Sequence, residues 1–146
     1  MNSEMLVELE SFFMALADKT RLRLLNLMRD GEICVCFFTE VLEESQPKIS
    51  RHLAYLRNAG LVEARRDGKW MHYKIIDPTN QIAANILRET LASLQTQADL
   101  QQDYARLKVA CCGILMPVAI EKALKPKTFV EANMYPQKQE LETFLL

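Results

Sequence analysis

The sequence has no long hydrophobic run and no recognisable export signal. No apolar stretch in its 146 residues approaches the roughly 20 residues needed to span a bilayer. The N-terminus also lacks the positively charged and then apolar region that a secretory signal would need. Internal repeats and low-complexity tracts are absent as well. We therefore expect one cytoplasmic domain with its own core and no membrane partner.

Cysteine is scarce, and its spacing argues against a disulfide framework. The four cysteines form two close pairs, Cys34-x-Cys36 and Cys111-Cys112. In a cytoplasmic chain such thiols stay reduced, and close pairs of thiols are typical of thiolate chemistry. Taken alone, either pair could equally consist of small apolar residues buried in a core. The pairs are candidate ligand sites that need support from the surrounding sequence.

The sequence carries little net charge, but that charge is unevenly distributed. The formal net charge is −1, and the isoelectric point lies near 6.1. Residues 46–74 nevertheless contain seven lysines or arginines against two acids, a net charge of +5, which leaves −6 for the other residues. A local basic patch of this kind is the electrostatic footprint of DNA binding.

The segment from Ser45 to Gly60 predicts a helix with one apolar and one polar face. Ser45 can cap its first turn, and Gly60 is typical of the residue just beyond a helix end. Ile49, Leu53 and Leu56 form an apolar stripe at i, i+4 and i+7. Several of the remaining side chains are donors of the kind that contact base edges and phosphates in a major groove, although a solvated polar face is the alternative.

A β-hairpin is predicted directly after this helix. Residues 61–65 and 69–75 have strand-like patterns, and Asp67-Gly68 between them is a typical hairpin turn. Basic side chains flank that turn, so a basic tip would project beside the helix. We expect base contacts from Gln46, Ser50, Arg51 and His52, and phosphate contacts from Lys48, Arg65, Arg66 and Lys69.

Three helices are predicted before the Ser45 helix. Apolar residues at helical spacing indicate helices over residues 5–17 and 20–29, and Asp18 can cap the second of them. A short helix over residues 37–43 turns directly into the Ser45 helix. With the hairpin, this order predicts a winged helix-turn-helix, a mainly α fold with a small β-hairpin (α+β).

A long helix is predicted after the hairpin, beyond Asp77-Pro78, because apolar residues recur at helical spacing from Ala83 to Leu107. About thirty residues of helix would span about 45 Å at 1.5 Å per residue, more than the domain's own diameter. Its apolar stripe would be buried against a second subunit, together with the first helix, giving a two-fold homodimer. We expect residues 1–108 to form the winged domain with its dimerisation helices, and residues 109–146 to form a cysteine-containing tail of unknown role.

Four runs of the sequence together carry a family resemblance. They are A-L-A-D-K-T-R-L-R-L-L-N-L-M, E-I-C-V-C-F-F-T-E-V-L, S-Q-P-K-I-S-R-H-L-A-Y-L-R-N-A-G-L-V and R-R-D-G-K-W-M-H-Y-K-I. The chain resembles the ArsR/SmtB family of metal-sensing repressors over about residues 5–107. The resemblance implies a homodimer that occupies operator duplex DNA until a metal or metalloid ion releases it. An arsenical-responsive branch has the signature E-L-C-V-C-D-L-C, which Glu32, Cys34, Val35 and Cys36 match.

The local match to that signature is incomplete. Phe37 replaces the acid after the second cysteine, and Thr39 stands where the branch carries a third cysteine. A site of three thiolates then needs one more sulfur. We expect it from Cys111 or Cys112, brought to the partner's cysteine pair by the long helix. A separate site at these two residues and simple apolar packing are the alternatives.

The Cys34-x-Cys36 pair also suggests how a bound ion would act. Residues at i and i+2 lie about 200° apart around a helix, but they share one side of an extended segment. One ion therefore cannot bind both cysteines within an intact helix. We expect binding to unwind or tilt the start of the 37–43 helix, which supports the Ser45 helix.

The candidate ligands favour soft, thiophilic ions. Tetrahedral zinc sites draw four ligands from cysteine, histidine and carboxylate, but the long-helix segment has no histidine, and His52 and His72 lie on the DNA-facing helix and hairpin. We expect As(III) or Sb(III) as the inducer, with cadmium or lead as alternatives. A thiol-redox or persulfide-sensing repressor would use the same cysteines. An enzyme such as a thiol oxidoreductase is not expected, since no catalytic constellation is visible.

Overall fold

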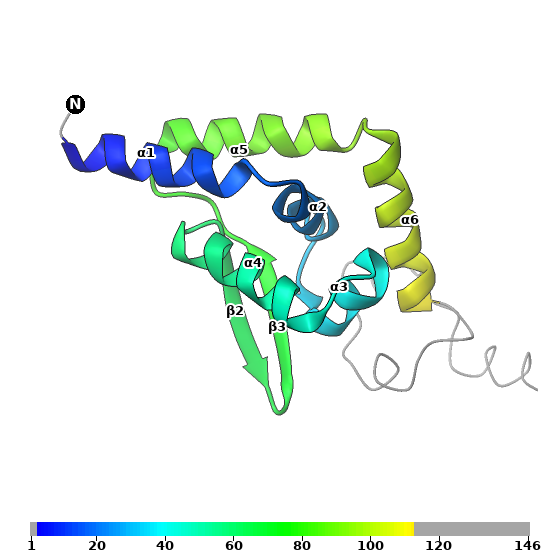
Figure 1. Ribbon diagram of the computed structural model, residues 1–146. Coiled ribbons are helices and arrows are strands. Elements are labelled where there is room, and N and C mark those ends of the chain that lie inside the picture. The colour runs from blue at the N-terminus through cyan, green and yellow to red at the C-terminus, as the bar shows by residue number, and fades with distance from the viewer. Residues whose placement is uncertain (1–2, 113–146) are drawn as a thin grey trace, which may run out of the picture.

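The computed structural model describes residues 3–112, and its elements follow the order of a winged helix-turn-helix (Figure 1). The helices are α1 (Ser3–Leu16), α2 (Lys19–Leu27), α3 (Val35–Leu42), α4 (Gln46–Asn58), α5 (Gln81–Leu94) and α6 (Ala98–Cys112). The strands are β1 (Ile33–Cys34), β2 (Val62–Asp67) and β3 (Trp70–Ile75). The predicted mainly α fold with a small hairpin is confirmed. Among residues 3–112, no helix is long and apolar enough to cross a membrane.

Local capping explains where α2 and α4 begin and where the hairpin turns. Asp18 and Ser45 each accept a hydrogen bond from the backbone N–H three residues further on, at 3.0 and 3.4 Å. Gly60 has a φ of 76° just beyond α4, and Gly68 has a φ of 60° in the turn between β2 and β3. Glycine adopts this left-handed conformation without strain. These boundaries are therefore fixed by residues that the sequence already identifies.

The hairpin belongs to a three-stranded antiparallel sheet with the order β1-β3-β2. Strand β1 was not predicted, because two residues are too few to show an alternating pattern. In its register Cys34 lies opposite His72. The sheet thus places the first cysteine of the candidate site at the junction between β1 and α3.

The core lies between the sheet and helices α2, α3 and α4. Its largest fully buried side chains include Phe37 and Phe38 of α3, with leucines from α2 and α4 around them. Val41 and Leu42 are buried as well, so one whole side of α3 belongs to the core. Helix α4 therefore packs against α3, and α3 begins at the cysteine pair.

The predicted single long helix after the hairpin is wrong. The chain forms two helices instead, α5 and α6, with a break at residues 95–97. In Figure 1, α6 leaves the end of α5 at a sharp bend and runs beside α2 toward α3. Its apolar stripe is buried within its own subunit, so it is not available to a partner. The stripe consists of Leu100, Tyr104, Leu107 and Cys111.

Side chains stabilise the break between α5 and α6 by satisfying backbone carbonyls. The Thr96 hydroxyl donates to the Ser93 carbonyl at 2.7 Å. The Gln101 amide donates to the Gln95 carbonyl at 3.0 Å. Neither proline nor glycine lies at residues 95–97, which is why the sequence pattern alone runs through the break. The tail predicted from residue 109 begins within α6, and residues 113–146 lie outside the described residues.

Candidate nucleic-acid interface and thiolate site

Helix α4 packs through its apolar stripe and leaves its polar face open. The three stripe residues are fully buried. Gln46, Ser50 and Arg51 lie on the exposed face. Within residues 3–112, none of these three side chains makes a hydrogen bond or an ion pair. Their donors are therefore exposed, and their contacts with base edges stay a prediction.

His52 has a different environment from the other predicted base-reading residues. Its Nδ1 lies 3.4 Å from Nη1 of Arg21 and 3.7 Å from a carboxylate oxygen of Asp18. The ring is half-buried against the start of α2. His52 thus has partners within the protein, and its contact with bases stays a prediction.

Arg21, which no sequence pattern marks as functional, joins α4 to the rest of the domain. Its guanidinium donates to the carbonyls of Ala15 and Met14 at 2.8 and 2.9 Å, beside its contact with His52. It also lies 4.1 Å above the ring of Tyr55 on α4. One side chain therefore links the end of α1, the start of α2 and the exposed side of α4.

Two of the predicted phosphate ligands already have acidic partners. Lys48 pairs with Glu44 at 2.8 Å, and Arg65 pairs with Glu32 at 2.6 Å. These hydrogen bonds hold the pKa of each glutamate below its ordinary value. Both pairs are exposed enough to exchange a carboxylate for a phosphate.

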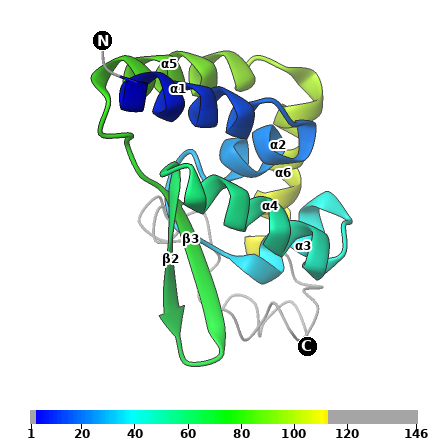
Figure 2. The same ribbon diagram turned by 60° about the vertical axis from the view of Figure 1, so that its left-hand side comes forward.

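The tip of the hairpin carries the other two predicted phosphate ligands. Arg66 donates to the Gly68 carbonyl at 3.1 Å, and Lys69 lies 5.4 Å from the ring of Trp70. Both cationic side chains are exposed. In Figures 1 and 2 this tip projects away from α1 and α5, on the side of the domain that also carries α4. The arrangement matches a helix and a wing that can contact one DNA duplex.

The Cys34-x-Cys36 pair lies at the junction of β1 and α3, and its two sulfurs are 3.3 Å apart. Cys34 is extended, with φ −71° and ψ 140°, and it precedes the first residue of α3. Cys36 lies in the first turn of that helix. Helix α3 begins at Val35, so only one of the two cysteines is helical and the two sulfurs lie close together at an intact helix start. The expectation that ion binding unwinds or tilts the start of this helix stays a prediction.

The hydrogen bond between the two thiols makes their pKa values differ. The Cys36 thiol donates to Cys34 and lowers the pKa of Cys34 to about 7. The same hydrogen bond, together with burial, raises the pKa of Cys36. The pair therefore presents one thiolate near neutral pH, which is the nucleophilic form that binds soft ions.

The third ligand of a thiolate site is not already in place. Among residues 3–112, no group of three or more histidine, cysteine or acidic side chains is positioned to hold a metal ion. The Thr39 hydroxyl donates to the Cys36 carbonyl at 2.9 Å, so it caps a backbone group and supplies no sulfur. Cys111 is fully buried in the same core cluster as Cys34, and Cys36 packs against that cluster. Cys112 is the last residue of α6.

His72 packs beneath the hairpin and does not face outward from it. Its side chain is buried, and its Nδ1 lies 4.0 Å from the Glu32 carboxylate. Within residues 3–112, Nε2 has no hydrogen-bond partner. Burial lowers the pKa of His72, so the ring is neutral at physiological pH. His72 is a packing residue in this structure.

The exposed polar face of α4 and the basic hairpin beside it define a DNA-binding protein of the winged helix-turn-helix class. Residues 18–64 match the family model of the bacterial regulatory proteins of the arsR family. The arsenical resistance operon repressor of Escherichia coli (strain K12) is 49% identical over 78 residues, which cover 53% of this chain and 67% of that repressor. The chain therefore belongs to the ArsR family of DNA-binding repressors, and these are transcriptional regulators, not enzymes.

Solved structures support the same assignment. The homodimeric winged helix-turn-helix domain Mb0332 from Mycobacterium bovis superposes with a TM-score of 0.53 at 27% identity, covering 65% of this chain and 87% of that domain. The AntR antimony-specific transcriptional repressor has a TM-score of 0.52 at 30% identity, covering 64% of this chain and 83% of its own.

Proposed function

We propose that this repressor is released from its operator when As(III) or Sb(III) binds Cys34 and Cys36. The observation that carries the proposal is the pair of sulfurs 3.3 Å apart at the start of α3. Thiolates favour soft ions over the harder ions that oxygen ligands bind. The similarity to an arsenical resistance repressor and to an antimony-specific repressor supports the same class of ion.

Ligand exchange at trivalent arsenic needs no redox partner. Arsenite in neutral water is As(OH)₃. At each thiol an As–S bond forms, an As–O bond breaks, and the thiol proton leaves with the hydroxide as water. Exchange at Cys34 and Cys36 therefore releases two waters and leaves one hydroxide on arsenic, which stays trivalent throughout.

The position of the cysteine pair offers a direct route to the DNA-binding helix. A three-residue turn joins α3 to α4, and Glu43 within it has a left-handed φ of 54°. Such a constrained turn transmits a shift of α3 to α4. A coupling of roughly 1 to 3 kcal/mol would weaken operator binding about 5- to 150-fold.

On the DNA side, we assign the predicted contacts to the two surfaces described above. The exposed face of α4 would read bases in a major groove, and the lysine and arginine side chains would contact phosphates. The base-reading residues are Gln46, Ser50, Arg51 and His52, and the phosphate ligands are Lys48, Arg65, Arg66 and Lys69.

We also propose a homodimer formed through α1 and α5. These helices lie side by side on the face opposite the hairpin tip (Figures 1 and 2). They expose large apolar side chains that a partner would cover. Among these are Leu6, Val7, Phe13, Met14 and Ile82. A two-fold dimer would present two α4 helices to successive major grooves of one operator.

Titration of the operator-bound dimer tests the inducer. Fluorescence anisotropy should fall with As(III) or Sb(III), and cadmium and lead should act more weakly. The Cys34→Ser/Cys36→Ser variant should bind the operator normally and stay bound at all arsenite concentrations. Thr39→Ser, which keeps the hydroxyl on the same turn, is the matched control and should respond like the wild type. Normal release of the double variant would exclude this inducer site.

A redox arm of the same experiment tests the main alternative. Peroxide would oxidise the cysteine pair to a disulfide and be reduced to water, and a polysulfide would transfer a zero-valent sulfur to a thiolate to give a persulfide. Under the proposal, arsenite releases the operator in the presence of excess reductant. Release by peroxide alone, reversed by reductant, would assign the pair to thiol-redox sensing.

A further inference from the structure

Helix α6 is part of its own subunit's core, which changes the geometry of any third ligand. Its buried residues follow one another at helical spacing and face α2 and α3. A helix that bends back in this way cannot extend about 45 Å toward a partner. Helix α6 therefore gives no structural support to a site shared between subunits.

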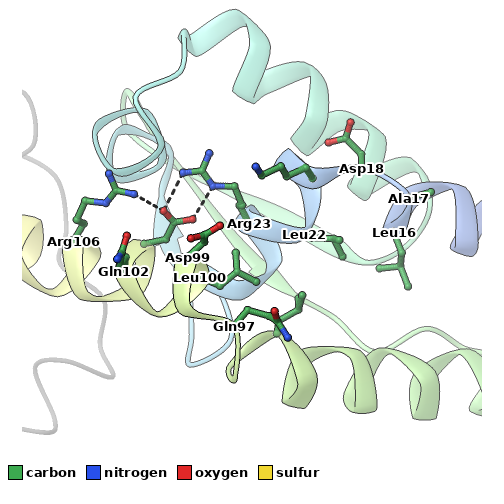
Figure 3. A pocket seen from close by; sticks show the side chains of 13 residues that line it. Leu16, Ala17, Asp18, Leu22, Arg23, Gln97, Asp99, Leu100, Gln102 and Arg106 are labelled. Carbon is green, nitrogen blue, oxygen red and sulfur yellow. Dashed lines mark hydrogen bonds and ion pairs between the residues drawn. The ribbon is translucent and has the colours of Figure 1, made fainter.

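The first half of α6 is anchored to α2 by polar contacts. Arg23 donates two hydrogen bonds to the buried carboxylate of Asp103, at 2.7 and 2.9 Å, and Arg106 adds a third at 2.7 Å (dashed in Figure 3). Asn26 donates to the Leu100 carbonyl at 3.0 Å. The anchor borders an open groove of about 700 Å³.

A second contact continues the anchor along the helix. The Tyr104 hydroxyl donates to Asp30, and the guanidinium of Arg29 lies 3.5 Å from the Tyr104 ring. These contacts hold the middle of α6 against the end of α2. Its final turn, which carries Cys111, lies beyond them and packs toward α3.

Cys111 and Cys34 thus belong to the same buried core, and α6 packs against α3, the helix that begins at the cysteine pair. Cys34 and Cys111 are both 0% exposed and belong to the same buried cluster, and Cys36 packs against it. Cys111 continues the buried stripe of α6 from Leu107, whereas Cys112 is one residue beyond that stripe. Cys111 therefore lies on the buried side of α6, which packs on α2 and α3.

We propose that Cys111 of the same subunit is the third thiolate of the inducer site. This inference rests on the proposed function. At arsenic, the last As–O bond breaks, an As–S bond to Cys111 forms, and the thiol proton leaves with the hydroxide as a third water. Because the described residues hold no preformed three-ligand group, the last turn of α6 must move toward the start of α3 to complete the site. Ion binding would thereby fasten α6 to α3.

Mixed dimers distinguish a site within one subunit from a site between subunits. Differently tagged subunits allow heterodimers to be purified, and X-ray absorption at the arsenic edge counts the sulfurs around As(III). In the first heterodimer, one subunit carries Cys34→Ser/Cys36→Ser and the other carries Cys111→Ser/Cys112→Ser. The proposal expects no three-sulfur site in this dimer. A three-sulfur site there would show that the ligands come from both subunits.

The reciprocal heterodimer is the matched control. It pairs a wild-type subunit with one in which all four cysteines are replaced by serine. The proposal expects one three-sulfur site per dimer, and a shared site expects none. The wild-type homodimer tests the proposed function separately from the third ligand. If it fails to bind As(III) or to leave the operator, the proposed function itself is overturned.

Single variants identify the ligand among the two adjacent cysteines. Cys111→Ser should lower the sulfur count from three to two, and Cys112→Ser should leave it at three. The opposite result would overturn the assignment. Cys111→Ala is a second variant, because serine at this buried position would introduce a hydroxyl that could destabilise the fold. Operator binding in the absence of inducer shows whether each variant is folded. Thr39→Cys in the Cys111→Ser background places a sulfur one turn beyond Cys36 and should restore the third As–S bond.

Discussion

The guanidinium of Arg21 adds polar contacts to the apolar packing that holds α4 on the domain. It contacts two carbonyls at the end of α1, the ring of His52 and the face of Tyr55. Such a planar, multidentate contact is specific to arginine, because lysine offers a single point charge. The position of α4 relative to the wing thus depends on a side chain that does not need to contact DNA.

Arg21→Ala should destabilise the domain and weaken DNA binding of all sequences equally. Loss of one partly buried and one exposed hydrogen bond to the carbonyls of α1, together with a cation–π contact, corresponds to about 1–3 kcal/mol of unfolding free energy. Arg21→Lys should recover only part of this loss. Chemical denaturation and operator anisotropy measure the two effects. A change in base preference with unaltered stability would contradict this role.

The side chains on α4 and on the hairpin should affect DNA binding in different ways. Ser50→Ala, Gln46→Ala or Arg51→Ala should each reduce discrimination between operator and non-operator duplex by about 1–3 kcal/mol, because each removes a donor to a base edge. Arg66→Ala should weaken binding to all duplexes and lower the salt slope by about one. Arg65→Ala should have a smaller effect, since Arg65 must first exchange its Glu32 partner. Binding isotherms at several salt concentrations provide the measurement.

At the scale of helices, the anchor between α2 and α6 should be a major source of stability. Asp103 is 1% exposed and has two arginine partners. Asp103→Asn leaves Arg23 without its charge partner and should cost about 3 kcal/mol of unfolding free energy. Arg106→Ala removes a half-exposed partner and should cost less than about 1 kcal/mol. Equal losses in urea denaturation would show that the buried pair is not the main contact.

Helix α4 and the break between α5 and α6 show which features a sequence pattern can and cannot predict. Helix α4, its caps and the hairpin turn follow from Ser45, Gly60 and Gly68, whose roles are local. The break at residues 95–97 has no such marker, because packing of α6 on α2 and α3 decides it. The cysteine pair was identified by spacing, but the short distance between its sulfurs depends on β1, which the pattern is too short to reveal.

At the scale of the whole molecule, the exposed apolar side chains of α1 should control assembly. Phe13→Glu or Leu6→Asp should shift the protein to monomers and lower operator affinity, because a charge on this face would remain buried in a dimer. Val109→Asp is the matched control, since Val109 is 67% exposed on α6, away from the proposed interface. Sedimentation velocity measures the result. Dimers with Phe13→Glu would place the interface elsewhere.

The uneven distribution of charge also affects how the protein behaves when no DNA is present. A net charge of +5 lies within residues 46–74, and −6 is spread over the other residues. Such a molecule is strongly dipolar although it is almost neutral, so the positive end of one particle attracts the negative end of another. Salt shortens the range of this attraction to about 10 Å at 0.1 M. DNA-free protein should therefore form clusters in dilute buffer near pH 6 and disperse as salt is added, which is the reverse of salting out.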